Sequence, residues 1–156
     1  MNDNTLLIIP KLRVHRNLTP QKLLEATGRE LFANPTATSM IPRQGEEEVD
    51  FCLFQPDPKE YVDGHIRPED VEQIYLNRWL QPDPYALVFA QLWLDSVFKN
   101  RIQSFSGWVG TNGSRYYLEL YKWGNGKFYV GTGLDDRNRP AGWWLGGVPK
   151  EPRAII

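Results

Sequence analysis

The sequence contains a single cysteine, Cys52, in 156 residues. One thiol cannot form an internal disulfide, so the disulfide-rich class of small secreted domains is excluded. The first residues, MNDNTLLIIPKLRVHR, also lack the basic stretch and the long apolar run of a secretory leader. We therefore expect a cytoplasmic protein.

Long hydrophobic runs are missing as well. A membrane-spanning helix needs about 20 consecutive apolar residues. The most apolar stretch, residues 85–98, is interrupted by Gln91 and Asp95. We expect no membrane span.

Neither sign of charge dominates, because the formal net charge is −1. The distribution is uneven: residues 44–100 hold twelve acidic and four basic side chains, and residues 101–156 hold four acidic and eight basic ones. An acidic middle argues against a nucleic-acid surface along the whole chain, and the basic excess at the end is small. Nucleic acid is therefore a less favoured partner than protein.

Recognisable catalytic motifs are absent. The two histidines, His15 and His65, lie fifty residues apart, and the chain has no HExxH, G-x-S-x-G, P-loop or GxGxxG pattern. The loop at 135–140, DDRNRP, lacks the spaced oxygen ligands of a calcium loop and is interpreted as a solvated turn with internal ion pairing. Cys52 falls in an alternating strand, where an inert thiol is the usual outcome. We expect no catalytic residue, no metal and no cofactor.

Aromatic and aliphatic residues, in contrast, are plentiful. The chain is 41% apolar and 13% aromatic, with six Trp, seven Tyr and seven Phe. A chain of this length buries roughly 70% of its unfolded surface, enough for a core without metal or disulfide. We predict one domain over 1–156.

Residues 1–100 are predicted to be rich in helices. Thr19-Pro20 and Asp83-Pro84 each place a capping side chain before a proline that suits the first helical position. The predicted elements are an edge strand at 5–14, a strand at 46–54, and helices at 19–33, 68–80 and 84–99. The last helix is apolar almost all round, which indicates either a central position in the domain or contact with a partner chain.

Residues 104–148 predict a β-meander. Asn112-Gly113 is typical of a two-residue hairpin loop, which would place Phe105 opposite Leu120. Gly124-Asn125-Gly126 predicts a three-residue loop, which would place Tyr121 opposite Tyr129. The run 143–148 is expected to return as a fourth strand, with a loosely held tail at 149–156.

These two registers sort the meander into two faces. One face is predicted to be core, and the other to form a binding surface because aromatic rings offer stiff contact area at small entropic cost. The predicted core residues are Phe105, Val109, Tyr116, Leu118, Leu120, Phe128, Val130 and Leu134. The predicted binding residues are Trp108, Tyr117, Glu119, Tyr121, Trp123 and Tyr129, beside Gly131 and Gly133.

Several interpretations of the aromatic face stay open. A helix could cover it, in which case the rings are ordinary core. If it is open, the leading hypothesis is a non-catalytic regulatory protein that contacts another protein, or a second copy of itself, through this face or through the helix at 84–99. The alternatives are a single-stranded nucleic-acid binder that uses the same face, and a small hydrolase or carbohydrate-acting enzyme centred on Glu119.

The predicted fold is therefore α+β. It consists of an antiparallel sheet of four to six strands, with the C-terminal meander at about 104–148 packed against about three helices.

Overall fold

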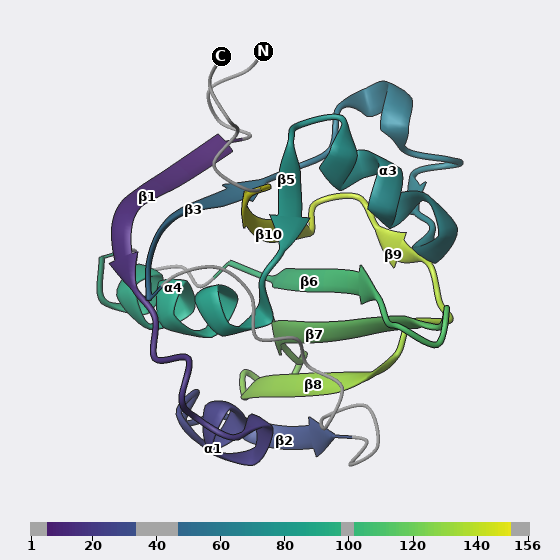
Figure 1. Cartoon of the computed structure of the whole chain (residues 1–156). Helices are drawn as coiled ribbons and strands as arrows, with labels where there is room; N and C mark the ends of the chain where they lie inside the picture. The colour runs from purple at the N-terminus through teal and green to yellow at the C-terminus, as the bar shows by residue number, and fades with distance from the viewer. Residues whose placement is uncertain (1–5, 34–46, 98–101, 151–156) are drawn as a thin grey trace, which may run out of the picture.

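The computed structural model describes residues 6–33, 47–97 and 102–150 of the chain. Its main feature is an eight-stranded sheet in the order β1-β3-β10-β6-β7-β8-β2, with β5 paired to β10, and a separate pair β4-β9 (Figure 1). The strands are β1 (Leu6–Arg13), β2 (Glu30–Ala33), β3 (Glu48–Phe54), β4 (His65–Ile66), β5 (Leu80–Pro82), β6 (Ser104–Val109), β7 (Arg115–Lys122), β8 (Phe128–Leu134), β9 (Arg139–Pro140) and β10 (Trp144–Pro149). The helices are α1 (Pro20–Glu25), α3 (Val71–Leu76) and α4 (Pro84–Val97), with 3₁₀ turns η2 (Pro58–Glu60) and η3 (Pro68–Asp70).

The α+β character agrees with the sequence prediction, but the predicted sheet was too small and its purely antiparallel character was wrong. Two of the strand pairs are parallel: β2 runs parallel to β8, and β6 runs parallel to β10. A parallel neighbour cannot be joined by a tight turn, so no hairpin signal marks it in the sequence.

Two predicted helices are shorter than expected because a strand follows each of them. The helix predicted at 19–33 ends after α1, where Gly28 adopts a φ of 65°, and the chain then forms β2. The helix predicted at 68–80 is divided into η3 and α3, and Trp79 at a φ of 55° redirects the chain into β5. Apolar spacing alone did not reveal these breaks.

The two strands predicted before residue 60, at 5–14 and 46–54, are present as β1 and β3. β1 is the edge strand, and its pairing with β3 is irregular between Ile9 and Leu12, so Pro10 lies at a bulge where no ladder hydrogen bond is required. In β3, Phe51 and Leu53 are buried in the main core with Val49 packed against it, as the alternation predicts.

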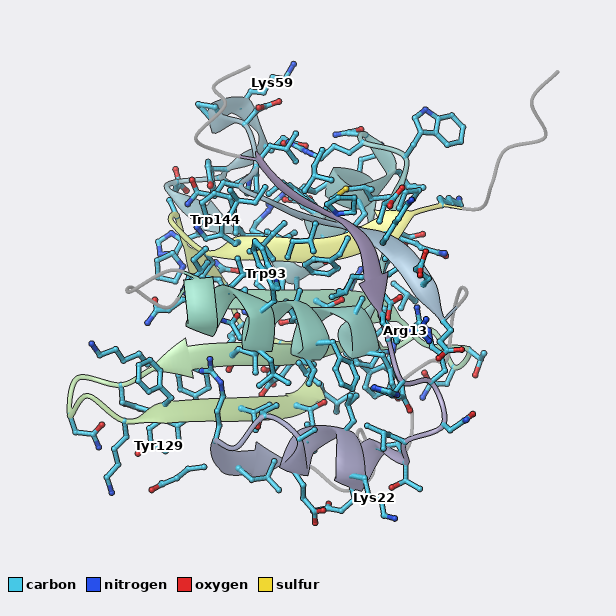
Figure 2. All side chains as sticks on the ribbon, turned by 90° about the vertical axis from the view of Figure 1, so that its left-hand side faces the viewer. Arg13, Lys22, Lys59, Trp93, Tyr129 and Trp144 are labelled. Atoms are coloured by element: carbon cyan, nitrogen blue, oxygen red, sulfur yellow. The ribbon has the colours of Figure 1, made fainter. Side chains whose placement is uncertain are left out.

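The long helix α4 covers one face of the sheet. Figure 2 looks onto α4, which lies in front of the strands with α1 below it. The helix contacts β1, β3, β6 and β10, and its residues 85–88 are completely buried. Leu92 and Trp93, which are 40% and 44% exposed, lie on the outer side. Of the helix at 84–99, residues 98 and 99 lie outside the described part of the chain.

Asp83 fixes the start of α4, as predicted. Its Oδ1 accepts a hydrogen bond from the Ala86 N–H at 3.0 Å. Arg16 donates to both carboxylate oxygens, at 2.7 and 2.6 Å, and the Asp83 side chain is fully buried. The N-terminal segment is thus tied to the core helix by a bidentate ion pair.

The two hairpins of the meander have the same loop geometry. In the second, Trp123 N–H donates to the Lys127 carbonyl, so the loop has three residues and Tyr121 lies opposite Tyr129, as predicted. In the first, Gly110 N–H donates to the Ser114 carbonyl in the same way. The predicted two-residue loop was therefore wrong, and Phe105 lies opposite Glu119 instead of Leu120.

This one-residue shift exchanges the two faces of β6, because side chains alternate along a strand. Trp108 lies in the main core beneath α4, stacked on Tyr116 with ring centroids 6.0 Å apart. Phe105 lies on the opposite face, in a second core cluster with α3, and Val109 shares that parity. The predicted face assignments of Phe105, Val109 and Trp108 are corrected accordingly.

The predicted fourth strand exists as β10, but it does not extend the meander beyond β8. It lies between β3 and β6, and it pairs with β6 only at Trp144–Ser104 and Leu145–Phe105. Beyond that point the two strands diverge. The Tyr75 hydroxyl of α3 donates a hydrogen bond to the Gly146 carbonyl of β10 at 2.8 Å, in the region where the two strands part. Of the predicted tail, residues 151–156 lie outside the described part.

Replacing Tyr75 with phenylalanine is expected to lower the free energy of unfolding by about 1–3 kcal/mol, because the buried Gly146 carbonyl loses its donor. Burial of this ring also raises the pKa of Tyr75 far above its ordinary value, so the hydroxyl stays neutral at physiological pH. Chemical denaturation of Tyr75→Phe and of Tyr61→Phe, whose ring is half-buried, measures the difference. Equal stability of the two variants would contradict this role of the Tyr75 hydroxyl.

Candidate functional site

The candidate site lies on the outer side of β7 and β8, opposite α4. Five aromatic side chains gather there, and we call them the aromatic panel: Tyr117, Tyr121, Trp123, Tyr129 and Trp143. Tyr121 occupies the centre, with ring centroids 5.6 Å from Tyr129, 6.1 Å from Trp123 and 6.3 Å from Trp143. Spacings of 4.5–7 Å are typical of favourable ring contacts, so these rings hold one another in place.

The panel is accessible at its centre and at one end. Trp123 is 53% exposed, Tyr121 and Trp143 are half-buried, and Tyr129 is buried beneath them. Among the described residues, α3 packs on β5 and β6, while α1 packs against α4 and shares the core on the far side of the sheet. None of these three helices lies over Trp123.

A cluster of four charged residues adjoins the panel at Tyr117. The Glu119 carboxylate is only 2% exposed and accepts hydrogen bonds from two guanidinium groups. Arg137 donates to its Oε1, and Arg139 donates to its Oε2 from Nε at 3.3 Å and from Nη2 at 3.2 Å. Arg139 also donates to Asp135 Oδ1 at 2.7 Å. Two acids and two bases thus compensate each other.

Aromatic rings complete the surroundings of Arg139. Its guanidinium carbon lies 4.2 Å from the centroid of the Phe105 ring and 4.9 Å from that of Tyr117. Weakly hydrated guanidinium groups stack well on aromatic faces, so the buried cation is stabilised by rings as well as by carboxylates. The Phe105 ring in turn contacts Trp143, with centroids 6.2 Å apart, and this contact links the charged cluster to the panel.

The charged cluster affects the two nearest phenols. Burial, followed by the neighbouring Glu119 carboxylate, raises the pKa of Tyr117. Burial also raises the pKa of Tyr121, and Glu119 contributes in the same direction. Both hydroxyls therefore stay protonated around neutral pH and can donate or accept hydrogen bonds, but neither is a candidate base at that pH.

The loop at 135–140 is more ordered than a solvated turn. The predicted internal ion pair exists, as Asp135 with Arg139, but both side chains are almost completely buried. The strand β9 in this loop pairs with β4, and this pairing holds the chain segment that leads to Trp143. A buried arginine between two carboxylates was not predicted from the local sequence.

The structure brings together five of the six residues predicted as the binding face: Tyr117, Glu119, Tyr121, Trp123 and Tyr129. Trp108 lies on the opposite face because of the altered register of β6. Trp143 is an additional member that we did not predict. Trp143 was predicted to begin the fourth strand, but nothing in the sequence placed it near Tyr121. That contact requires β10 to lie beside β6.

In the described ranges, the side chains that build metal or thiol sites do not gather in one place. No group of three His, Cys, Asp or Glu side chains there could hold a metal ion. His65 is exposed, with its Nδ1 2.8 Å from the Asp63 carbonyl oxygen, and His15 packs against the Phe89 ring. Burial and the nearby Asp50 raise the pKa of Cys52, which disfavours the reactive thiolate.

None of the helices in the described residues has the length and apolar character needed to cross a membrane. The chain matches no protein-family model, and comparisons with curated proteins and with solved structures also found no match.

Proposed function

We propose that the chain is a non-catalytic binding protein that recognises a partner protein through the aromatic panel. The observation that carries this proposal is the half-exposed Trp123, which lies on rings that already pack against one another. Rings held in place before binding lose little conformational freedom in a complex, so their burial is converted efficiently into affinity.

The composition of the surface supports a protein partner. Tyr, Trp and Arg are the residues enriched in binding hot spots. The Arg137 side chain is 58% exposed, and its guanidinium carbon lies 5.8 Å from the Tyr117 ring centroid. The panel therefore offers apolar area with a cation at its edge, a combination that suits an apolar side chain flanked by a carboxylate.

The alternatives are less well supported by the same geometry. For an enzyme centred on Glu119, the carboxylate would need to reach a substrate, but guanidinium groups occupy both of its oxygens. For a single-stranded nucleic acid, the panel could stack bases, yet the charged cluster supplies no net positive charge.

A second apolar surface, Leu92 and Trp93 on α4, is smaller (Figure 2, where Trp93 is labelled). A cytoplasmic location belongs to the proposal and rests on the single cysteine.

Site-specific photo-crosslinking tests the proposal. A photoreactive phenylalanine analogue at position 123 should capture one dominant protein partner in cells, and the same analogue at position 79 should not. Trp79 is a matched control because it is 57% exposed on another part of the surface. The captured protein is then purified and titrated against the chain. Equal capture at both positions would contradict the proposal.

With the purified partner, Trp123→Ala and Tyr121→Ala are each expected to weaken binding by about 30-fold or more, the range of hot-spot residues. Trp79→Ala is expected to change the affinity less than threefold. Isothermal titration calorimetry measures all three variants. If the affinities of Trp123→Ala and Trp79→Ala fall equally, the panel is not the interface.

Salt dependence separates the protein-binding proposal from nucleic-acid binding. Binding to a partner protein through the panel is expected to change little between 50 and 200 mM salt, whereas an oligonucleotide complex loses affinity steeply over that range. Titration with a 20-nucleotide poly-dT strand is the direct probe. Tight, salt-sensitive binding that is lost in Tyr121→Ala would favour the nucleic-acid alternative.

Size-exclusion chromatography with light scattering shows whether the partner is a second copy of the chain.

A further inference from the structure

A separate pocket of about 190 Å³ opens between α3 and the sheet, where β10 and β6 diverge. The wall formed by α3 carries Val71 and Leu76, and β5 contributes Gln81 and Pro82 on the other side. Gly107 and Val109 of β6 form the third side. Beyond Leu145, β5 takes the place of β6 beside β10, and the pocket lies between β5, β6 and α3.

The edge of β6 presents free hydrogen-bonding groups to this pocket. Residues of an antiparallel strand alternate between those that bond to the neighbouring strand and those whose backbone groups point the other way. The Gly110 N–H bonds to the Ser114 carbonyl of the hairpin, so the backbone N–H and C=O of Trp108 also point toward β7. The backbone groups of Gly107 and Val109 therefore point the other way, toward the pocket. Within the described residues, the Val109 N–H and C=O have no hydrogen-bond partner.

A buried carboxylate supplies a further acceptor. The Asp135 side chain is 2% exposed and lines the pocket. Its Oδ1 is occupied by Arg139, whereas its Oδ2 has no hydrogen-bond partner among the described residues and lies 3.6 Å from where a Cβ on Gly107 would stand. Burial, partly offset by Arg139, raises the pKa of Asp135. A buried carboxylate oxygen without a partner is stabilised by a hydrogen bond, so it favours a ligand that carries an N–H donor.

The remaining walls restrict the shape of a ligand. Apolar cavities of about 150 Å³ admit a benzene ring, so 190 Å³ with an open mouth accommodates one ring and part of a second. A residue in a strand edge presents its N–H and C=O side by side, which matches a planar group that carries an acceptor next to an N–H.

We propose that this pocket binds a small planar lactam-type heterocycle, the class that includes nucleobases. The ring carbonyl and the adjacent N–H pair with the Val109 N–H and C=O, and an amino substituent donates to Asp135 Oδ2. Val71 and Leu76 of α3 cover the ring. This inference is independent of the aromatic panel, because neither requires a ligand in the other site.

The direct test uses two matched probes, 2-aminoquinazolin-4(3H)-one and its 3-methyl derivative, which lacks only the ring N–H. Titrated into ¹⁵N-labelled protein, the first is expected to shift the amide resonance of Val109 and of its neighbours in a saturable manner. The methylated probe is expected to bind at least roughly tenfold more weakly, because the Val109 carbonyl is left unpaired.

Two variants localise the site. Gly107→Ala places a methyl group 3.6 Å from Asp135 Oδ2 and 3.3 Å from Val71 Cγ1, and it is expected to weaken probe binding at least roughly tenfold. Gly124→Ala, where a Cβ meets nothing within 4 Å, is the matched control and should bind normally. Leu76→Trp, at a position 38% exposed, fills the pocket from its rim and provides the same test if Gly107→Ala unfolds.

Three results would overturn the proposal. The first is the absence of saturable binding of the aminoquinazolinone at millimolar concentration. The second is equal affinity for the two probes or equal binding by Gly107→Ala and Gly124→Ala. The third is tighter binding of an extended blocked dipeptide, N-acetyl-valine methylamide, at the same resonances, which would assign the free edge of β6 to peptide recognition instead.

Discussion

Replacing Glu119 with alanine is expected to lower the free energy of unfolding by about 3–5 kcal/mol, the cost of removing one side of a buried ion pair. The substitution leaves Arg139, which is 3% exposed, with only Asp135 as a charged partner. For a chain of this size the midpoint of thermal unfolding should fall by roughly 6–20 °C. Chemical denaturation with a full two-state fit is the measurement.

A matched control distinguishes burial from charge. Glu47 also pairs with an arginine, Arg13, at 2.9 Å, but both side chains are more than 60% exposed. Glu47→Ala is therefore expected to change stability by about 1 kcal/mol or less. A Glu119→Ala variant that is no less stable than Glu47→Ala would show that the charged cluster does not hold the loop at 135–140 against the sheet.

Replacing Asp83 with alanine is the second substitution with a large expected effect. The carboxylate both caps α4 at Ala86 and binds Arg16 through two hydrogen bonds, while fully buried. Loss of a cap costs about 1 kcal/mol and loss of a buried ion partner about 3–5 kcal/mol, so a total of at least about 3 kcal/mol is expected. Urea unfolding followed by circular dichroism reports this loss.

Two further variants separate the contributions of Asp83. Asp83→Asn keeps an oxygen for the Ala86 N–H but removes the charge, and an intermediate loss of stability is expected. Thr19→Ala removes only the cap of the short helix α1, where Thr19 accepts from the Lys22 N–H at 3.2 Å, and should cost about 1 kcal/mol. If Asp83→Ala costs no more than Thr19→Ala, the ion pair with Arg16 contributes nothing.

Local signals in the sequence predicted much of the fold. The edge position of β1 and the cap of α4 were predicted, and so were the buried face of β3 and the register of the second hairpin. Each depends on residues that are close in the chain, such as Asp83 with Pro84. Interactions of this kind can be inferred from the residues themselves.

The first hairpin shows where local signals become ambiguous. A two-residue loop of type I′ requires positive φ at both Asn112 and Gly113, whereas a three-residue loop with a bulge requires it only at the glycine. In the structure Gly113 has a φ of 83°, and Asn112 is not among the described non-glycine residues with positive φ. The same Asn-Gly pair fits both loops, so the sequence could not decide a register that moves Trp108 from one face to the other.

The charged cluster could not be predicted because its members meet only through the tertiary fold. Arg139 reaches Glu119 and Phe105 across the sheet, although these residues are separated by 20 and 34 positions. Similarly, the contact of Trp143 with Tyr121 follows from β10 running parallel to β6, for which no turn signal exists. Long-range pairings of this kind are set by the whole core.

The pairing of β6 with β7 is the feature on which the accessible panel depends, and backbone nuclear Overhauser effects test it most directly. In residue pairs that do not exchange hydrogen bonds, the two α-protons point at each other. We predict strong α-proton contacts between Phe105 and Glu119 and between Gly107 and Tyr117. Contacts that instead place Phe105 opposite Leu120 would return Trp108 to the Tyr121 face and contradict the site described above.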